Sequence, residues 1–513
     1  MLPLKEKDKP IVQKLLSAGC CARCVLRFCC VSVQAAYRKP PQDTLNELQA
    51  FISSTENPKT QDSASPPEDP PSKRAKLEAG PSEEDAAAAV KLKDEESRVC
   101  VVCLGILQDL CGPAQALKVS ETVKAEKYEF DTLVLSVSLP AQLCVREHSC
   151  WLHVKKELRE KSIAVDRDDL IQVKEAFKWI MQGLVAKELG GVAVVTRVGD
   201  RNEEEKELFN ATTCSDCFKP TKNKQSVFTR MAVVKALEKI ADAKFLKHYP
   251  SPPAQPTSSC IPQDVQCLHM SVFVAGRYNK FCRSLPQTPW VIDGERRMES
   301  SVEELIAAPV LSSFRSDGFN FSSSGREDVD VRTLGNGRPF AMELLNPHRS
   351  RLSRAEMKQL QETINKSSDK IRVRDLQIVT REAMSRMKEG EEEKTKSYTA
   401  LIWTLKPIQR EDITFIDDIK DLTLDQKTPL RVLHRRALAV RQRVIHSMNT
   451  RFLDSHHFYL GLKTQAGTYI KEFVHGDFGR TKPNLCELLR TDTDILELDV
   501  ESVDVDWPPS IPE

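Results

Sequence analysis

Two Cys-x-x-Cys pairs, far apart in the chain, constrain the fold more than any other feature of the sequence. The first pair is Cys21 and Cys24, and the second is Cys100 and Cys103. This spacing lets two thiolates reach one tetrahedral Zn²⁺ from a tight turn, so the four sulfurs predict a closed, structural zinc site. Closing the long loop costs roughly a few kcal/mol, well below the roughly 10–16 kcal/mol that structural zinc supplies. The metal would therefore hold the N-terminal segment in place.

Other cysteines compete for this role. Cys214 and Cys217 form a third pair, and Cys20, Cys29 and Cys30 offer substitute ligands at one end. Buried or free thiols are the alternative to a metal site. We expect all sixteen cysteines to be reduced, because the N-terminus lacks the apolar block of a secretory signal peptide.

Residues 54–97 differ sharply in composition from the rest of the chain. They are rich in Ser, Pro, Glu, Asp and Lys and contain no aromatic residue. Such a segment buries too little apolar surface to offset its ordering entropy, which predicts a disordered insertion. Within it, the basic cluster Pro71–Leu77 is of the kind that a nuclear-import receptor reads, so we expect the protein in the nucleus and the cytoplasm.

Charge and hydropathy narrow the class of protein. With 40% apolar and 29% charged residues, and no apolar run near the roughly 20 residues of a membrane helix, we expect a soluble protein. The formal net charge is only +1, but two basic patches stand out. Each patch alone could equally be a solvated face, whereas both together favour RNA modestly. The candidate RNA-binding residues are Lys219, Lys222, Lys224 and Arg230 in one patch, and Arg435, Arg436, Arg441 and Arg443 in the other.

Periodicity predicts an α/β protein. Residues 133–139 are typical of a strand, and apolar residues at helical spacing from Leu170 to Leu184 predict an amphipathic helix. From residue 271 onward, strands and helices alternate, which predicts a mixed sheet with covering helices. The Gly335–Gly337 turn predicts a hairpin that joins residues 329–332 to a strand at 340–345. Ser353 and Glu356 form a capping box for a helix through about residue 364.

Asp328, in Gly325-Arg326-Glu327-Asp328, lies at the entrance of the strand predicted from Val329. Period-two alternation places Asp328, Asp330 and Arg332 on one face. Local pattern alone favours a charged edge strand here.

The same four residues resemble the Gly-Arg-x-Asp motif of pseudouridine synthases. A second segment, Gly467–Lys471, resembles the Gly-Thr-Tyr-Ile-Arg/Lys motif of these enzymes. Three longer blocks, 274–280, 285–290 and 332–340, resemble the Pus-ten family of archaea and eukaryotes, which carries an N-terminal THUMP-containing domain. This resemblance covers nearly the whole chain apart from the insertion and includes the paired cysteines.

The resemblance implies roles for individual residues. Asp328 would be the catalytic nucleophile, and Lys471 would hold it ionised. Tyr398 would stack on the flipped uracil, and Tyr469 and Ile470 would line the same pocket, with no organic cofactor. A further pocket leucine is expected at Leu496 or Leu498. Whether Asp328 attacks the ribose or first abstracts a proton stays open.

The resemblance also implies a domain order and a substrate. Residues 1–53 and 98–270 would form a zinc-binding, THUMP-containing RNA-binding domain, and residues 271–513 a catalytic domain with a mixed, mainly antiparallel sheet. The substrate would be the neighbouring uridines 54 and 55 in the TΨC arm of tRNA, bound by a monomer that recognises RNA shape. An alternative is a non-catalytic factor that binds folded RNA, for example primary microRNA. A zinc-dependent protein adaptor would account only for the first hundred or so residues.

Overall fold

The structure is a computed structural model of the chain, and it describes most of its residues. The described residues are 1–54, 98–129, 131–161, 165–200, 217–218, 230–260, 265–389 and 393–512. They divide into two compact units, Met1–Lys127 with Thr132–Leu268, and Tyr128–Asp131 with His269–Glu513. Nearly all of the predicted insertion, and Lys219, Lys222, Lys224 and Cys214, lie outside the described residues.

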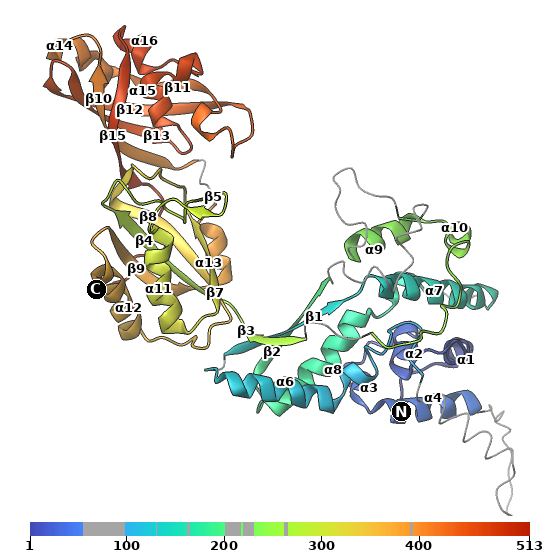
Figure 1. Cartoon of the computed structure of the whole chain (residues 1–513). Helices are drawn as coiled ribbons and strands as arrows, with labels where there is room; N and C mark the ends of the chain where they lie inside the picture. The colour runs from blue at the N-terminus through green and yellow to red at the C-terminus, as the bar shows by residue number, and fades with distance from the viewer. Residues whose placement is uncertain are drawn as a thin grey trace, which may run out of the picture. The chain divides into compact units, whose positions relative to one another are not determined.

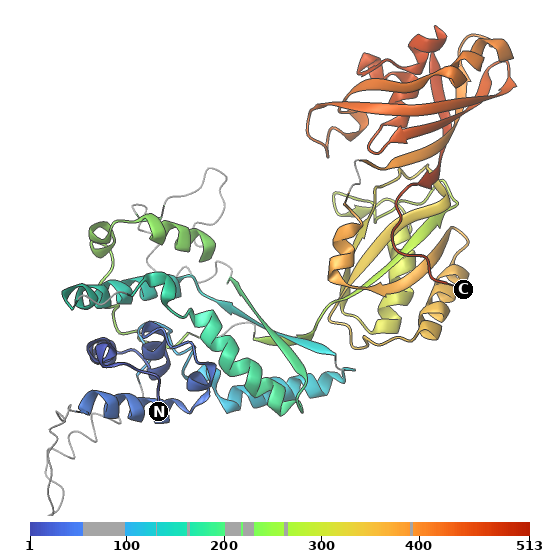
Figure 2. The ribbon, with the colours of Figure 1, turned by 180° about the vertical axis from the view of Figure 1, so that it is seen from behind.

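The first unit consists mainly of helices around a small sheet (Figures 1 and 2). Strand β1 (Thr132–Leu139) pairs in parallel with β2 (Ala193–Asp200), and β3 (Gln266–His269) completes the order β2-β1-β3. The predicted strand at 133–139 is confirmed. The helix predicted from Leu170 to Leu184 is α8 (Val173–Glu188). It begins three residues later than predicted, because Leu170 has an extended backbone at the end of a short 3₁₀ turn. The other helices are α1 (Lys9–Ala18), α2 (Ala22–Phe28), α3 (Gln34–Arg38), α4 (Pro41–Ser53), α6 (Pro113–Glu126), α7 (Gln142–Glu160), α8 (Val173–Glu188), α9 (Arg230–Lys239) and α10 (Asp242–Leu246).

The second unit is organised by one long, mixed sheet. Its strand order is β14-β11-β12-β13-β10-β15-β8-β4-β9, with β7 also paired to β8. Every pairing is antiparallel except β15 with β8, so the predicted mixed, mainly antiparallel sheet is confirmed. The strands are β4 (Val272–Lys280), β7 (Gly318–Ser323), β8 (Arg332–Leu345), β9 (Ile371–Val379), β10 (Thr395–Thr404), β11 (Lys420–Lys427), β12 (Val440–Asp454), β13 (His457–Gln465), β14 (Thr481–Lys482) and β15 (Thr493–Val503); β5 (Val291–Ile292) and β6 (Glu295–Arg296) form a separate ribbon.

Helices cover this sheet and close two apolar cores. One core lies between β4, β8 and β9 and the helices α11 (Val302–Phe314) and α12 (Arg354–Ser367), and the other lies between β10, β13 and β15 and the helix α15 (Ile470–His475) (Figure 1). The capping box of α12 is confirmed, because Ser353 and Glu356 bind each other's backbone. The helices are α11 (Val302–Phe314), α12 (Arg354–Ser367), α13 (Arg381–Arg386), α14 (Arg410–Ile413), α15 (Ile470–His475) and α16 (Leu485–Leu489). No helix in the described ranges is both long and apolar enough to span a membrane.

The predicted hairpin around Gly335–Gly337 is wrong, because this segment lies inside the single strand β8. Gly335 and Gly337 have positive φ angles of +62° and +80°. Such glycines are typical of turns, but here they let neighbouring backbone approach closely. A Cβ on Gly335 would lie 1.7 Å from the carbonyl oxygen of Glu501. Asn336 between them exchanges hydrogen bonds with the backbone of Val503. The glycines therefore permit β8 to meet the end of β15.

Strand β8 also begins later than expected, at Arg332, and a turn at residues 329–330 separates it from Asp328. Two residue pairs join β8 to β15, and Arg332 forms a bidentate ion pair with Asp499 there, with distances of 2.9 and 2.6 Å. Asp328 is thus placed on a loop at the middle of the sheet, where its two halves meet.

Candidate active site

A cavity of about 450 Å³ opens at this junction in the second unit. Its walls come from the loop before β8, from β10 and β15, from the segment before β12, and from the start of α15. The residues that line it include Gly325, Arg326, Glu327, Asp328, Val331, Lys396, Tyr398, Arg431, Arg435, Arg436, Arg441, Arg443, Tyr469, Ile470, Lys471 and Leu498. The structure therefore brings all the catalytic and pocket residues expected from the sequence to one place.

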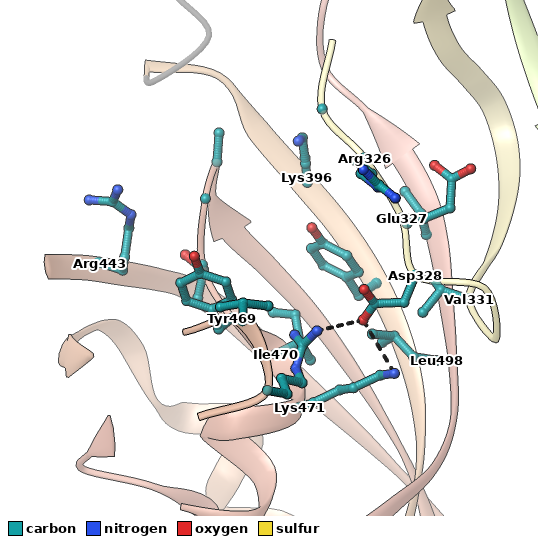
Figure 3. A pocket seen from close by; sticks show the side chains of 18 of the residues that line it. Arg326, Glu327, Asp328, Val331, Lys396, Arg443, Tyr469, Ile470, Lys471 and Leu498 are labelled. Atoms are coloured by element: carbon teal, nitrogen blue, oxygen red, sulfur yellow. Dashed lines mark hydrogen bonds and ion pairs between the residues drawn. The ribbon is translucent and has the colours of Figure 1, made fainter. Parts of the chain in front are cut away.

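The carboxylate of Asp328 faces three cationic side chains. Its Oδ2 lies 2.8 Å from Nη1 of Arg431 and 3.3 Å from Nζ of Lys471, the two contacts drawn as dashed lines in Figure 3. Its Oδ1 lies 3.9 Å from Nη2 of Arg435. Lys471 also donates to both oxygens of Asp330, at 2.8 and 3.0 Å. Partial burial favours a higher pKa for Asp330, but Lys471 outweighs it and the pKa is lowered.

Arg431 links Asp328 to the buried carboxylate of Glu472. Its guanidinium donates from Nε and Nη2 to Glu472, whose side chain is 1% exposed. Burial alone would lower the pKa of Arg431, but Glu472 and Asp328 raise it. An arginine held this way has a fixed orientation, because its planar fork is bonded at two positions. Arg431 is therefore a positioning residue for the Asp328 carboxylate.

Glu327 anchors the loop from the opposite side. Figure 3 shows the side chains of Glu327 and Asp328 pointing away from each other. Glu327 is fully buried, pairs with Nε of Arg338 at 2.7 Å and accepts from the hydroxyl of Tyr278 at 2.8 Å. Burial would lower the pKa of Arg338, but Glu327 reverses the direction and raises it. The neighbour of Asp328 is thus part of a buried charge network.

The backbone of the Asp328 loop is fixed by a buried lysine. Nζ of Lys280 donates to the carbonyls of Leu285, Asp328 and Val329 at 2.7, 3.1 and 3.0 Å. Burial lowers the pKa of Lys280. Gly325 is required at the start of the loop, because its φ is +88° and a Cβ would lie 2.6 Å from both Arg338 Nη1 and Lys396 Nζ.

Helix α15 is positioned by a buried amide. The side chain of Gln426 accepts from the backbone N–H of Tyr469 at 3.0 Å and donates to its carbonyl at 2.9 Å. Gln426 is 1% exposed, so this clamp is shielded from water. This clamp fixes the backbone of Tyr469, the residue before α15. It thereby sets the directions in which the side chains of Ile470 and Lys471 point from the start of the helix.

Tyr398 and Leu498 supply an apolar wall on neighbouring strands β10 and β15. Burial raises the pKa of Tyr398, which keeps its hydroxyl neutral. Leu498 is 7% exposed and lines the cavity, whereas Leu496 is 51% exposed and does not. The structure therefore favours Leu498 of the two leucines left open by the sequence.

The basic residues of the second patch reach the same cavity. Arg435, Arg436, Arg441 and Arg443 all contribute to its lining. Arg443 packs against Gly467, where a Cβ would lie 3.2 Å from its Nε. The motif glycine at 467 is thus needed for the close approach of a guanidinium as well as for its φ of +80°.

In the first unit, the four cysteines expected to bind metal come together. The Sγ atoms of Cys21, Cys24, Cys100 and Cys103 all lie within 4.8 Å of one another, and three of the four residues are buried. Among the described residues, no other group of three or more His, Cys, Asp or Glu side chains could hold a metal ion. Cys20, Cys29, Cys30 and Cys217 therefore belong to no such group. Four thiols at this separation, with no carboxylate among them, fit the donor set of a structural metal ion.

Of the four candidate RNA-binding residues of the first basic patch, the structure describes Arg230. It begins α9 and lines a cavity of about 400 Å³ together with Cys144, Glu147 and Arg167. The other predicted residues of this patch, Lys219, Lys222 and Lys224, lie outside the described residues. Their RNA-binding role stays a prediction.

Two family models match most of the chain. Residues 100–267 match the model described as "Eukaryotic Pus10, N-terminal", and residues 273–504 match "Pus10, C-terminal". The chain belongs to the Pus10 family. The resemblance seen in the sequence motifs is thereby confirmed.

Two curated vertebrate Pus10 relatives match along their whole length. A mouse protein named tRNA pseudouridine synthase Pus10 is 58% identical, and a human protein of the same name is 55% identical, each over 100% of both chains. An archaeal relative from Thermofilum pendens is 29% identical over 80% of this chain and 77% of its own. Among solved structures, a Cbf5-Nop10-Gar1 complex matches 44% of this chain and 48% of that chain at 14% identity, with a TM-score of only 0.25.

Sequence reasoning on this Pus10-family chain missed several residues of the site. Arg431 precedes Arg435 and Arg436 in the same basic segment, but nothing local in the sequence shows that it reaches Glu472 and Asp328. Glu327 occupies the variable position of the Gly-Arg-x-Asp motif. Its partner Arg338 falls within the block 332–340 that carries the resemblance, which is the one signal that could have suggested a role.

Proposed function

We propose that this Pus10-family chain is a tRNA pseudouridine synthase that isomerises uridines 54 and 55 of the TΨC arm, with Asp328 as nucleophile. Its curated full-length relatives carry the name tRNA pseudouridine synthase. One observation carries the residue assignment: the carboxylate of Asp328 lies in a basic cavity, bonded by Arg431 and Lys471, with Tyr398 in the same lining.

The isomerisation needs no external reactant. The bond between C1′ of the ribose and N1 of uracil breaks, the detached base rotates, and a bond between C1′ and C5 forms. The proton leaves C5 and N1 gains one, so the product is an isomer of the substrate. The negative charge of Asp328 serves as nucleophile or base in this sequence, and Arg431 and Lys471 stabilise that charge and fix its direction.

The apolar wall gives the target base a place outside the RNA stack. Extruding a uridine costs roughly a few kcal/mol, which contacts in the enzyme must offset. Tyr398 offers an aromatic face, and Ile470 and Leu498 exclude water around it. Because the cavity of about 450 Å³ lies in the usual size range of ligand pockets, it can hold a flipped nucleotide.

The basic rim supports recognition of folded RNA. Arg435, Arg436, Arg441 and Arg443 surround the cavity and can bind phosphates beside the flipped uridine. Such contacts orient an RNA by its shape rather than by its sequence. We infer that this rim binds the TΨC arm and that the patch around Arg230 binds a more distant part of the tRNA.

We also infer that Cys21, Cys24, Cys100 and Cys103 hold a structural Zn²⁺. A bound zinc would supply a crosslink between the N-terminal helices and the segment that follows the insertion. The four sulfurs leave no open coordination position, so the metal takes no part in the isomerisation. We propose both the nucleus and the cytoplasm as locations, on the basic cluster at 71–77 alone.

Unmodified tRNA transcripts test the proposed substrate. Wild-type protein is incubated with three transcripts: the natural sequence, one with uridine 54 replaced by cytidine, and one with uridine 55 replaced. Pseudouridine is then mapped by base-specific chemistry. We expect modification at both sites in the first transcript and at the remaining site in each of the others. Binding without any product would instead favour the non-catalytic RNA-binding factor.

A further inference from the structure

The turn that follows α15 has an uncommon backbone conformation. Four consecutive residues, Gly476, Asp477, Phe478 and Gly479, have positive φ angles of 83°, 50°, 56° and 80°. Glycine adopts this region readily, but Asp477 and Phe478 carry a Cβ that opposes it. An aromatic residue in the left-handed region is a clear outlier, and such outliers persist only where the surroundings enforce them.

The surroundings of this turn do enforce it. The N–H of Gly476 donates to the carbonyl of Glu472 at 2.7 Å, which ends the helix. The carboxylate of Asp477 is 6% exposed, accepts from the backbone N–H of Leu430 at 3.3 Å and pairs with Arg480 at 3.6 Å. Arg480 in turn donates to the carbonyl of Thr428 at 2.7 Å. The turn is therefore bonded to the segment 428–430 on both sides.

The result of this strained turn is a fully presented aromatic ring. Phe478 is 94% exposed, so its ring gains almost nothing from packing within the chain. The strain at Phe478 is thus not repaid by burial in the folded chain. A bound partner that covers the ring would supply the missing stabilisation.

The position of the turn relative to the catalytic cavity indicates the kind of partner that would cover the ring. Leu430, whose N–H donates to the carboxylate of Asp477, precedes Arg431, whose guanidinium lies 2.8 Å from Asp328. Lys471 lies in the first turn of the short helix α15, and Phe478 follows three residues after the end of that helix. The turn that carries the exposed ring is therefore bonded to the residue that precedes Arg431 of the cavity wall.

Exposed cations lie on the two segments that meet at the turn, and one exposed acid, Asp425, lies opposite Lys482 in the pairing of β11 with β14. Arg435 and Arg436 are exposed and line the cavity, and the exposed Lys482 lies next to Gly479. The nearby acids Asp477 and Glu472 are buried and paired with arginines. An exposed aromatic ring among unburied cations is the arrangement that binds unpaired nucleic acid, where bases stack on the ring and phosphates meet the cations.

We infer that Phe478 is a stacking platform for an unpaired base of the bound tRNA, next to the target uridine but outside the catalytic cavity. This inference rests on the proposed function for the identity of the RNA. The rigid left-handed turn holds the ring in place before the RNA arrives, which reduces the ordering cost of binding. The contact would help to choose which uridine enters the cavity.

Three variants of the full chain test this inference by their affinity for an unmodified tRNA transcript. Phe478→Ala should bind roughly 5- to 150-fold more weakly, the range that corresponds to 1–3 kcal/mol of stacking on one base. Phe478→Trp should bind within about threefold of wild type, because it keeps an aromatic face. Phe478→Gly should lose affinity like the alanine variant while unfolding at the same or a higher temperature, because glycine relieves the backbone strain.

Leu453→Ala is the matched control, since Leu453 is 51% exposed on β12 and lines no part of the cavity; its tRNA affinity should equal that of wild type. The inference is overturned if Phe478→Ala binds tRNA like wild type, or if Phe478→Gly unfolds several degrees lower, which would indicate a structural role. Absence of pseudouridine from the wild-type reaction would reject the proposed activity alone, because the affinity comparison does not depend on turnover.

Discussion

Replacing Glu327 by Gln should damage catalysis without touching the reacting groups. The change leaves the guanidinium of Arg338 buried, with 2% exposure, and removes the charge that compensates it at 2.7 Å. Loss of one partner of a buried ion pair costs about 3–5 kcal/mol, and Gln retains an acceptor for Tyr278, so we expect about 3 kcal/mol. For a unit of this size, that free energy corresponds to a fall of about 6–12 °C in its unfolding temperature.

The kinetic effect follows from the position of Glu327 beside Asp328. A displacement of about 1 Å in a reacting group can cost about 10²-fold in rate. We therefore expect the single-turnover rate of pseudouridine formation to fall by about that factor, while the affinity for tRNA stays close to wild type. Single-turnover reactions with excess enzyme, together with a thermal unfolding scan, measure both quantities.

Glu343→Gln is the matched control in the same sheet. Glu343 lies on β8, is 25% exposed and is 3.9 Å from the exposed Arg381, so its pair contributes at most about 1 kcal/mol. This variant should react and unfold like wild type. If Glu327→Gln matched wild type in both rate and unfolding temperature, the buried pair would not position Asp328 and the reasoning would be refuted.

Three further predictions concern RNA binding, metal and pH. Reversing charge at Arg435 and Arg436 to Glu should weaken tRNA binding and flatten its dependence on salt; an unchanged salt slope would exclude phosphate contacts there. Cys24→Ser should lower the zinc content of purified protein well below one ion per chain, whereas Cys111→Ser, at a buried thiol outside the cluster, should retain it. Burial lowers the pKa of His148 to about 4, so the unfolded chain binds its proton first and stability falls by up to about 3 kcal/mol as pH drops from 6.5 to 4. A His148→Leu variant with the same acid sensitivity would contradict this cause.

The sequence predicted the parts of the site that are written as local motifs. Cysteine spacing predicted that Cys21, Cys24, Cys100 and Cys103 share one metal ion, because a two-residue gap leaves few geometries for a shared ligand, although Cys214 and Cys217 have the same spacing. The resemblance placed Lys471 beside Asp328, although the two residues are far apart in the chain. Motifs of this kind indicate which side chains come together in the fold, so this part of the site could be predicted from the sequence.

Other parts depend on tertiary contacts that no local pattern contains. Gly335 and Gly337 suggested a hairpin, since positive φ is typical of turns, but here it serves the approach of β8 to β15. Leu496 and Leu498 are two residues apart on β15, and the pairing of β15 with β10 shifts register at Leu496, so that Leu498 lines the cavity and Leu496 does not. The bond from Arg431 to Glu472 likewise arises only when α15 docks.

The most direct test of the account is a comparison of wild type with Asp328→Asn on one unmodified tRNA transcript. Asparagine keeps the size of the side chain and removes its charge, and tRNA affinity measured in parallel shows that the fold and the basic rim are intact. We expect pseudouridine at positions 54 and 55 with wild type and none with the variant at equal tRNA occupancy. Equal product from both proteins would contradict the assignment of Asp328 as nucleophile.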